Sequence, residues 1–183
     1  MSVVKHKIIE EIALIEISNP PVNAISAAVR IGLLEIIENL SLNEKIKAIV
    51  ITAPERTFLA GADIKEFGKK VDAPILGKIC DKIESLNKIV VASLHGTPLG
   101  GGLEVAMSAH YRIAAPNTKV GLPEVLLGIL PGAGGTQNLP RAVGIRRAKE
   151  IILTGKPFDG QQALSWGLVN QLFPLEDLIF QSI

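Results

Sequence analysis

Residues 96–105 read GTPLGGGLEV, and the three consecutive glycines, Gly100 to Gly102, stand directly before an apolar run with helical character. Glycine is less favourable than alanine inside a helix by about 1 kcal/mol. Its missing side chain also exposes backbone N–H groups and lets another group approach them closely. The stretch therefore predicts a short helix, from about residue 102 to 109, whose start offers bare backbone to a ligand.

Short apolar runs and amphipathic segments alternate on both sides of this stretch. Runs of aliphatic residues predict strands, and apolar residues spaced three or four apart predict helices. The predicted strands cover residues 7–9, 12–17, 47–52, 89–94, 111–114 and 119–121, and the predicted helices cover 27–40, capped by Ser26, and 74–86. The alternation indicates an α/β fold. Because no linker interrupts it, we expect a single domain over residues 1–183.

The remaining segments have a less regular pattern of apolar residues. Residues 54–63 and 129–137 are rich in turn-forming residues and predict loops, whereas 146–153 and 160–166 predict helices. The final residues, PLEDLIFQSI (174–183), place Leu175, Leu178 and Ile179 on one face of a short helix. Two interpretations stay open for this apolar face: it packs on its own domain, or it is covered by a continuing chain or by a partner.

The charge balance excludes broad classes of partner. The chain has 19 basic and 18 acidic residues, a net charge of +1, and no apolar run long enough for a membrane span. Without a large field of one sign, neither nucleic acid nor a membrane surface is an expected partner. The single cysteine, Cys80, favours a reducing compartment, so the cytoplasm is expected, with the mitochondrion and the peroxisome as alternatives.

Several common cofactor and catalytic motifs are missing from the sequence. No Walker A loop, complete G-x-G-x-x-G fingerprint or G-x-S-x-G elbow occurs, and the three histidines lack the spacing of metal ligands. Cys80 falls within the predicted helix 74–86, where a small buried residue is the expected role. We therefore expect neither a metal nor a separate cofactor.

Three loops each contain glycine or alanine residues that leave the backbone accessible. LAGAD (59–63), PLGGGLE (98–104) and LPGAGGTQ (130–137) all place glycine or alanine where a ligand could approach. Two backbone N–H donors aimed at one point form an oxyanion hole, and the positive end of a helix dipole adds to the field there. These loops favour a site that stabilises a developing negative charge on oxygen.

Taken with NPPVNAIS (19–26), the stretches FLAGADIKEF (58–67), HGTPLGGGLEVAMSAHYRIA (95–114) and VGLPEVLLGILPGAGGTQNLPR (120–141) resemble the crotonase family of enoyl-CoA hydratases and isomerases. NPPVNAIS and AHYRIA are most similar to the hydratase part of bifunctional fatty-acid β-oxidation enzymes. The resemblance implies a crotonase-type spiral of repeated ββα units. It also implies that the C-terminal helical region is missing, so that these residues form the N-terminal part of a longer chain.

The resemblance further implies an acyl-CoA thioester substrate and syn addition of water to a 2-enoyl-CoA, giving 3-hydroxyacyl-CoA in fatty-acid β-oxidation. CoA belongs to the substrate, and the expected assembly is a homotrimer or hexamer, or a bifunctional enzyme. By motif position, the oxyanion donors are the N–H groups of Ala60 and Gly101, the acid and base are Glu104 and Glu124, Gly132 helps to fix the water, and Ala24, Ala62, Asp63 and Ile64 contact the substrate or its CoA.

The two glutamates are assigned different roles. Glu104 is predicted to take a proton from water, and Glu124 to give one to the substrate α-carbon. Each one taken singly fits a plain structural role at the start of a helix, where a carboxylate is favourable. Two alternatives also remain open at this point: a Δ3,Δ2-enoyl-CoA isomerase, which needs one carboxylate, and a truncated acyl-CoA-binding module without turnover.

Overall fold

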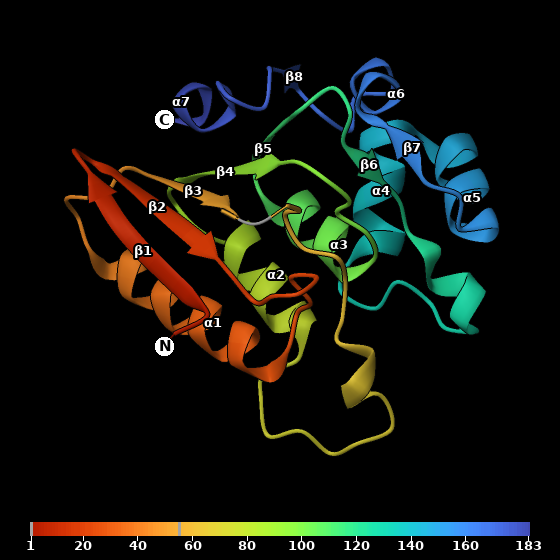
Figure 1. Ribbon diagram of the computed structural model, residues 1–183, viewed down its shortest axis with the longest axis horizontal. Helices are drawn as coiled ribbons and strands as arrows, with labels where there is room; N and C mark the ends of the chain where they lie inside the picture. Colours follow the sequence, from red (N-terminus) through yellow and green to blue (C-terminus); the bar gives the residue numbers. More distant parts are fainter. Residues whose placement is uncertain (1, 55) are drawn as a thin grey trace.

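A six-stranded sheet organises the fold, as the computed structural model shows for residues 2–54 and 56–183. Residues 1 and 55, which fall within the predicted domain and the predicted loop 54–63, lie outside the described residues. The strand order is β1-β2-β3-β4-β5-β8, with β1 antiparallel to β2 and all later pairs parallel (Figure 1). The strands are β1 (Val4–Ile9), β2 (Ile12–Ile17), β3 (Ala48–Thr52), β4 (Ile89–Leu94), β5 (Tyr111–Ala114) and β8 (Gln171–Leu172).

Three helices cover one face of this sheet. These are α1 (Ala27–Leu42), α2 (Leu76–Glu84) and α3 (Gly101–Ser108), which lie side by side in Figure 1. The Ser26 side chain accepts a hydrogen bond from Val29 N and caps α1, as predicted. Residues Ile49, Val50 and Ile51 of β3 are fully buried, as expected for a parallel strand covered on both faces.

The chain repeats a strand, a short second β contact and a helix. After β2 and β3, Ile25 and Ala62 form a parallel bridge, and after β4 and β5, Leu99 and Gly121 form another. Ile25 leads into α1, and Leu99 leads into α3. The expected ββα repeat is therefore present, with several of its second strands reduced to single bridges, and it brings the loops that follow neighbouring strands together at one edge of the sheet.

The second half of the chain departs more often from the sequence prediction. It contains β6 (Lys119–Val120), η2 (Pro123–Leu127), α4 (Gly135–Val143), α5 (Ile145–Thr154), β7 (Phe158–Asp159) and α6 (Gly160–Ser165). Helix α4 begins inside the predicted loop 129–137 and includes Pro140, which lacks a helical N–H donor. Leu139 and Val143 of this helix are buried in the core, and this burial favours the helix in spite of the missing bond. The two-residue strands β7 and β8 are too short to show a period in the sequence.

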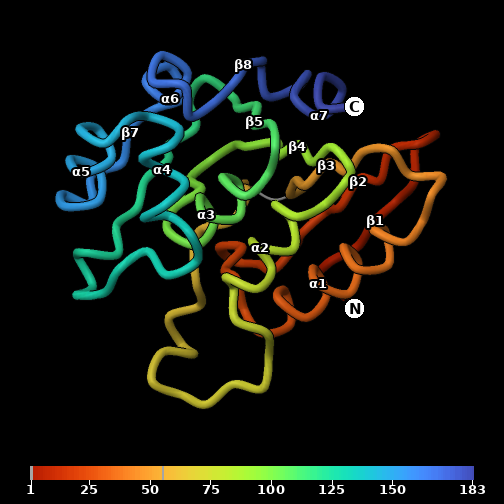
Figure 2. Tube along the Cα trace, turned by 180° about the vertical axis from the view of Figure 1, so that it is seen from behind, coloured from red at the N-terminus to blue at the C-terminus, as the bar shows by residue number. Residues whose placement is uncertain are grey.

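The last helix is shorter than predicted. Helix α7 (Leu178–Ser182) packs against β4 and β5, on the face of the sheet opposite α1 to α3 (Figure 2). Leu178 is 1% exposed, so this residue packs on its own domain, whereas Leu175 is 53% exposed and precedes the helix. Among the described residues, no helix has the length and apolar character that crossing a bilayer demands.

Candidate active site

The glycines of GTPLGGGLEV bring α3 against two neighbouring loops. All eight residues of α3 are buried. Gly100 has a φ of 52°, in the left-handed region that glycine tolerates, and a Cβ at this position would lie 3.0 Å from Glu124 Oε1. A Cβ on Gly102 would overlap the Leu59 carbonyl oxygen. The glycines therefore let protein backbone approach protein backbone, before any ligand is considered.

Two unpaired N–H groups lie where these loops meet. A Cβ on Gly101 would lie 3.7 Å from Ala62 N, so the start of α3 and the 59–63 loop are in close contact. Among the hydrogen bonds of the described residues, none uses the N–H of Gly101 or of Ala62 as donor. The pair has the character of an oxyanion hole, in which two donors point at one oxygen.

Ala60 differs from this arrangement. Its N–H donates to the carbonyl oxygen of Asn23 at 3.2 Å, so this predicted oxyanion donor is already occupied. Gly61, with a φ of 110°, turns the chain between Ala60 and Ala62. Ala62, which motif position had assigned to CoA contact, is thus the residue of this loop whose N–H lies beside Gly101 and has no acceptor among the described residues.

A cavity of about 140 Å³ adjoins these N–H groups. Its lining is mostly apolar and comes from three segments: Ala60, Gly61, Ala62, Ile64 and Phe67; Leu99, Gly100 and Gly101; and Pro123, Glu124, Leu127 and Ile129. Glu124 is the only ionisable residue among the described residues that line it. The cavity offers an apolar surface with one carboxyl group beside two backbone donors.

Glu104 is held by the glycine-rich loop that follows η2. Its side chain is buried, and Oε1 accepts hydrogen bonds from Ala133 N at 2.7 Å and Gly135 N at 2.9 Å. Burial raises the pKa of the Glu104 carboxyl, while these two N–H donors act to lower it. Gly132 directly precedes Ala133 in this loop and is exposed, and it is not one of the two residues that donate to Glu104.

Glu124 sits in a different environment at the start of η2. It is 8% exposed, and its Oε2 has no hydrogen-bond partner among the described residues. Burial raises the pKa of this carboxyl, its own backbone N–H acts to lower it, and the negative charge of Glu104 raises it further. Two interacting carboxyls in unequal surroundings are the arrangement that separates an acid from a base.

The other predicted substrate contacts are distributed around the rim. Asp63 accepts a hydrogen bond from Lys65 N at 3.0 Å and caps the short helix η1 (Ile64–Glu66). Asp63 and Ala62 also line a second depression of about 270 Å³, and Ile64 is exposed. Ala24 lines neither of these two hollows, and its carbonyl oxygen accepts from Asn19 Nδ2 at 2.8 Å.

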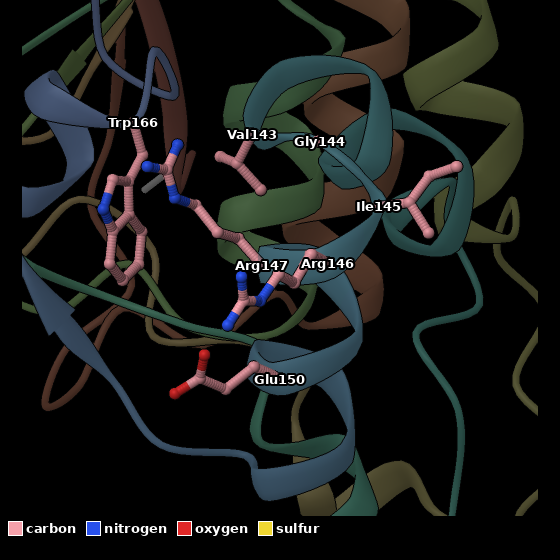
Figure 3. Close-up of a pocket in the computed structure, with 7 residues that line it drawn as sticks. All are labelled: Val143, Gly144, Ile145, Arg146, Arg147, Glu150 and Trp166. Carbon is pink, nitrogen blue, oxygen red and sulfur yellow. The ribbon is translucent and has the colours of Figure 1, made fainter.

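A larger cavity, of about 500 Å³, lies elsewhere (Figure 3). Its lining includes Arg147, whose guanidinium lies 5.4 Å from the Trp166 ring centroid, and none of the predicted site residues. Cys80 is buried, which raises the pKa of its thiol to about 12 and fits the expected structural role. Among the described residues, no group of His, Cys, Asp and Glu is placed to hold a metal ion.

Sequence reasoning missed the residues that hold the site together. Ala133 and Gly135 bind Glu104 through their backbone N–H groups. Asn23, a residue of NPPVNAIS to which no role was assigned, is 1% exposed and is bonded to the 57–60 segment. The glycine-rich composition of 130–137 was a signal for the first pair. No local pattern distinguished Asn23 from an ordinary turn residue.

Comparison with known proteins agrees with this architecture. Residues 7–183 match the family described as enoyl-CoA hydratase/isomerase. The chain is 48% identical to the peroxisomal bifunctional enzyme of Danio rerio over 88% of its own length and 22% of that protein. It is 43% identical to a probable enoyl-CoA hydratase of Bacillus subtilis, over 87% of its own length and 64% of that protein.

Among solved structures, the enoyl-CoA hydratase of Bacillus anthracis superposes with a TM-score of 0.92 at 31% identity, over 98% of this chain and 73% of that one. The chain thus spans less than two thirds of the length of both curated relatives, while its fold follows the solved hydratase over almost every residue. On its sequence match, its fold and its paired loops, the chain belongs to the enoyl-CoA hydratase/isomerase family.

Proposed function

We propose that this site adds water across the double bond of a 2-enoyl-CoA thioester and yields a 3-hydroxyacyl-CoA. The observation that carries the proposal is the pair of buried, electrostatically coupled carboxyls, Glu104 and Glu124, beside the unpaired N–H groups of Ala62 and Gly101. The apolar lining of the adjoining cavity suits an acyl chain.

The thioester carbonyl oxygen is the group that fits the two N–H donors. As water adds to the β-carbon, negative charge moves onto this oxygen, and donors already in place stabilise it without reorganisation. Gly101 is the first residue of α3, so the positive end of the helix dipole points at the same oxygen. In this proposal Ala62 takes the donor role that motif position had assigned to Ala60.

The surroundings of the two glutamates divide their roles. The two N–H bonds to Glu104 Oε1 favour its ionised form, so Glu104 removes a proton from the water whose oxygen bonds to the β-carbon. Glu124 lacks such donors on Oε2 and faces the charge of Glu104, so it is kept protonated and delivers its proton to the α-carbon. Return of a proton from Glu104 to Glu124 resets the pair.

The substrate and its assembly follow as companion proposals. Ala62, Asp63 and Ile64 line the two hollows that we assign to the acyl-CoA. Ala24 and Gly132 line neither of them, and their proposed roles in substrate contact and in holding the attacking water rest on motif position alone. The bifunctional relative supports a place in a multifunctional chain. A role in fatty-acid β-oxidation and a homotrimer or hexamer are the further parts of this proposal. Sedimentation of the purified chain measures the assembly directly.

Hydration of crotonyl-CoA tests the proposal. We expect the conjugated enoyl-thioester absorbance to fall, with 3-hydroxybutyryl-CoA as the product, and we expect Glu104→Gln and Glu124→Gln to abolish this loss. Turnover that survives both substitutions would contradict the two-glutamate mechanism. Turnover of a 3-enoyl-CoA alone would indicate an isomerase, and thioester binding without any turnover would indicate a binding module.

A further inference from the structure

Asn23 is a buried polar residue for which the proposed chemistry has so far assigned no task. It is 1% exposed and has a φ of 56°, a left-handed conformation that asparagine adopts more readily than most residues. Its Oδ1 accepts from Asn19 N at 2.8 Å. Its Nδ2 faces the carbonyl oxygens of Ile17 at 3.1 Å, Thr57 at 3.2 Å and Phe58. A buried amide with this many partners holds two chain segments in one arrangement.

The second of these segments is the loop that carries the oxyanion donor. The Asn23 side-chain amide donates to the main-chain carbonyl oxygens of Thr57 and Phe58. The main-chain carbonyl oxygen of Asn23 accepts a hydrogen bond from Ala60 N at 3.2 Å. Asn23 therefore contacts three of the residues that lead directly into Ala62.

Ile25 completes the same alignment through its backbone. Its N–H donates to the Gly61 carbonyl at 2.8 Å, and its carbonyl accepts from Asp63 N at 3.4 Å. The peptide groups on either side of Ala62 are thus bonded to the 23–25 segment, while the Ala62 N–H is left without an acceptor among the described residues. Within this alignment Asn23 supplies the side-chain bonds, whereas Ile25 uses main-chain atoms.

We propose that Asn23 is a positioning residue for the oxyanion hole: its side-chain amide sets the place of the Ala62 N–H relative to the Gly101 N–H. This inference rests on the proposed function and adds a residue to it. An oxyanion donor must lie within about 3 Å of the charged oxygen, and an error of about 1 Å lowers rates by about 10²-fold. Asn23 acts through the loop and touches no reacting atom.

Two substitutions remove the N–H donors of the Asn23 side chain, one by deleting the side chain and the other by replacing the amide with a carboxyl group. Asn23→Gly keeps the left-handed conformation and loses every side-chain bond. Asn23→Asp keeps the shape and the acceptor but replaces the N–H donors by a second oxygen among carbonyl oxygens. The matched control is Asn19→Ala, because Asn19 Nδ2 bonds within the 19–26 loop, to Ala24 O and Ser26 Oγ, and makes no bond to the 57–63 segment.

The experiment measures kcat and KM with crotonyl-CoA, and the red shift of cinnamoyl-CoA absorbance on binding, because polarisation of the thioester carbonyl shifts a conjugated chromophore. We expect both Asn23 variants to bind cinnamoyl-CoA with little change in Kd, to lose most of the red shift, and to lose about 10²-fold in kcat. Asn19→Ala is expected to keep the red shift and kcat even where its Tm falls.

The outcomes separate this inference from the function on which it rests. A full red shift and wild-type kcat in either folded Asn23 variant at saturating ligand would overturn the positioning role while leaving the hydratase proposal intact. Equal loss of the red shift in Asn19→Ala would overturn it too, since loop destabilisation alone would then explain the effect. A wild-type protein that neither shifts cinnamoyl-CoA nor hydrates crotonyl-CoA would overturn the proposed function and this inference together.

Discussion

Helix α3 and the 3-10 helix η2 each contribute one glutamate to the site, yet the two elements are built differently. Every residue of α3 is buried, and the Glu104 carboxyl accepts hydrogen bonds from two backbone N–H groups. In η2 Glu124 is the one buried residue, Leu126 and Leu127 are 70% and 60% exposed, and the Glu124 Oε2 has no partner among the described residues. One carboxyl is bonded within the core, and the other lines an apolar cavity.

The comparison shows how two glutamates acquire different hydrogen-bond partners and different influences on their pKa values. Burial raises the pKa of both carboxyls, but only the Glu104 carboxyl gains two donors from another loop, and the Glu104 charge raises the pKa of Glu124. The local sequence of each glutamate places it at a helix start; the difference between them comes from what the fold packs against each one.

Exchange of the α-proton of butyryl-CoA with D₂O should give the largest difference between the Glu104 and Glu124 variants. This saturated thioester cannot be hydrated, so exchange needs only the oxyanion donors and the carboxyl group at the α-carbon. We expect Glu124→Gln to lower the exchange rate by about 10²–10⁴-fold and Glu104→Gln to lower it much less. NMR follows the exchange, and the reverse order of the two variants would mean that the roles are interchanged.

Substitution of Gly102 tests whether the close packing of α3 is needed. The added Cβ of Gly102→Ala meets the Leu59 carbonyl, so we expect a loss of about 1–3 kcal/mol in the free energy of unfolding, measured by urea denaturation. Gly77→Ala in α2 is the control. A Cβ on Gly77 would lie 3.9 Å from its nearest neighbour, the Gly132 carbonyl oxygen. Replacing a glycine by alanine inside a helix stabilises the folded protein by about 0.5–1 kcal/mol. Equal stability changes in both variants would show that α3 tolerates displacement.

The pH profile of kcat/KM sharpens the assignment of acid and base. With Glu104 required as carboxylate and Glu124 required as carboxylic acid, we expect a bell shape with about tenfold change per pH unit on each limb. Because the pKa values of both carboxyls are raised, both limbs lie above the usual glutamate pKa of about 4.3, and the two apparent values belong to the coupled pair. Activity that is independent of pH from 5 to 10 would exclude a role for this pair.

Thermal unfolding of Glu124→Gln gives the smallest expected effect. A carboxyl whose pKa is higher in the folded than in the unfolded chain stabilises the fold below its unfolded pKa, about 4.3, and this contribution is lost as the pH rises through the folded pKa. Glutamine does not titrate. The variant's Tm minus the wild-type Tm should therefore be more positive at pH 8 than at pH 4, by a few degrees, in calorimetry; an unchanged or opposite difference would contradict the raised pKa.

Much of the architecture could be predicted from the sequence, because hydrophobic periodicity is a local property. Strand β4 and strand β5 begin and end at the predicted residues, and α1 starts at its predicted Ser26 cap. Helix α4 was not predicted, since its glycines and Pro140 oppose a helix locally and only burial of Leu139 and Val143 favours one. The loops and glutamates of the site were likewise visible as motifs, and their catalytic roles stay predictions.

The sequence by itself determined the strands and helices of the first half of the chain, the three bare-backbone loops and the two carboxyls that lie beside them. Only the tertiary structure decided that Ala62 rather than Ala60 has an N–H without a partner among the described residues, that Glu104 and Glu124 have unequal surroundings, and that the Asn23 side chain is bonded to Thr57 and Phe58. Each of these depends on hydrogen bonds between residues about 30 positions apart. Such bonds form only when the loops after neighbouring strands meet, which no local pattern encodes.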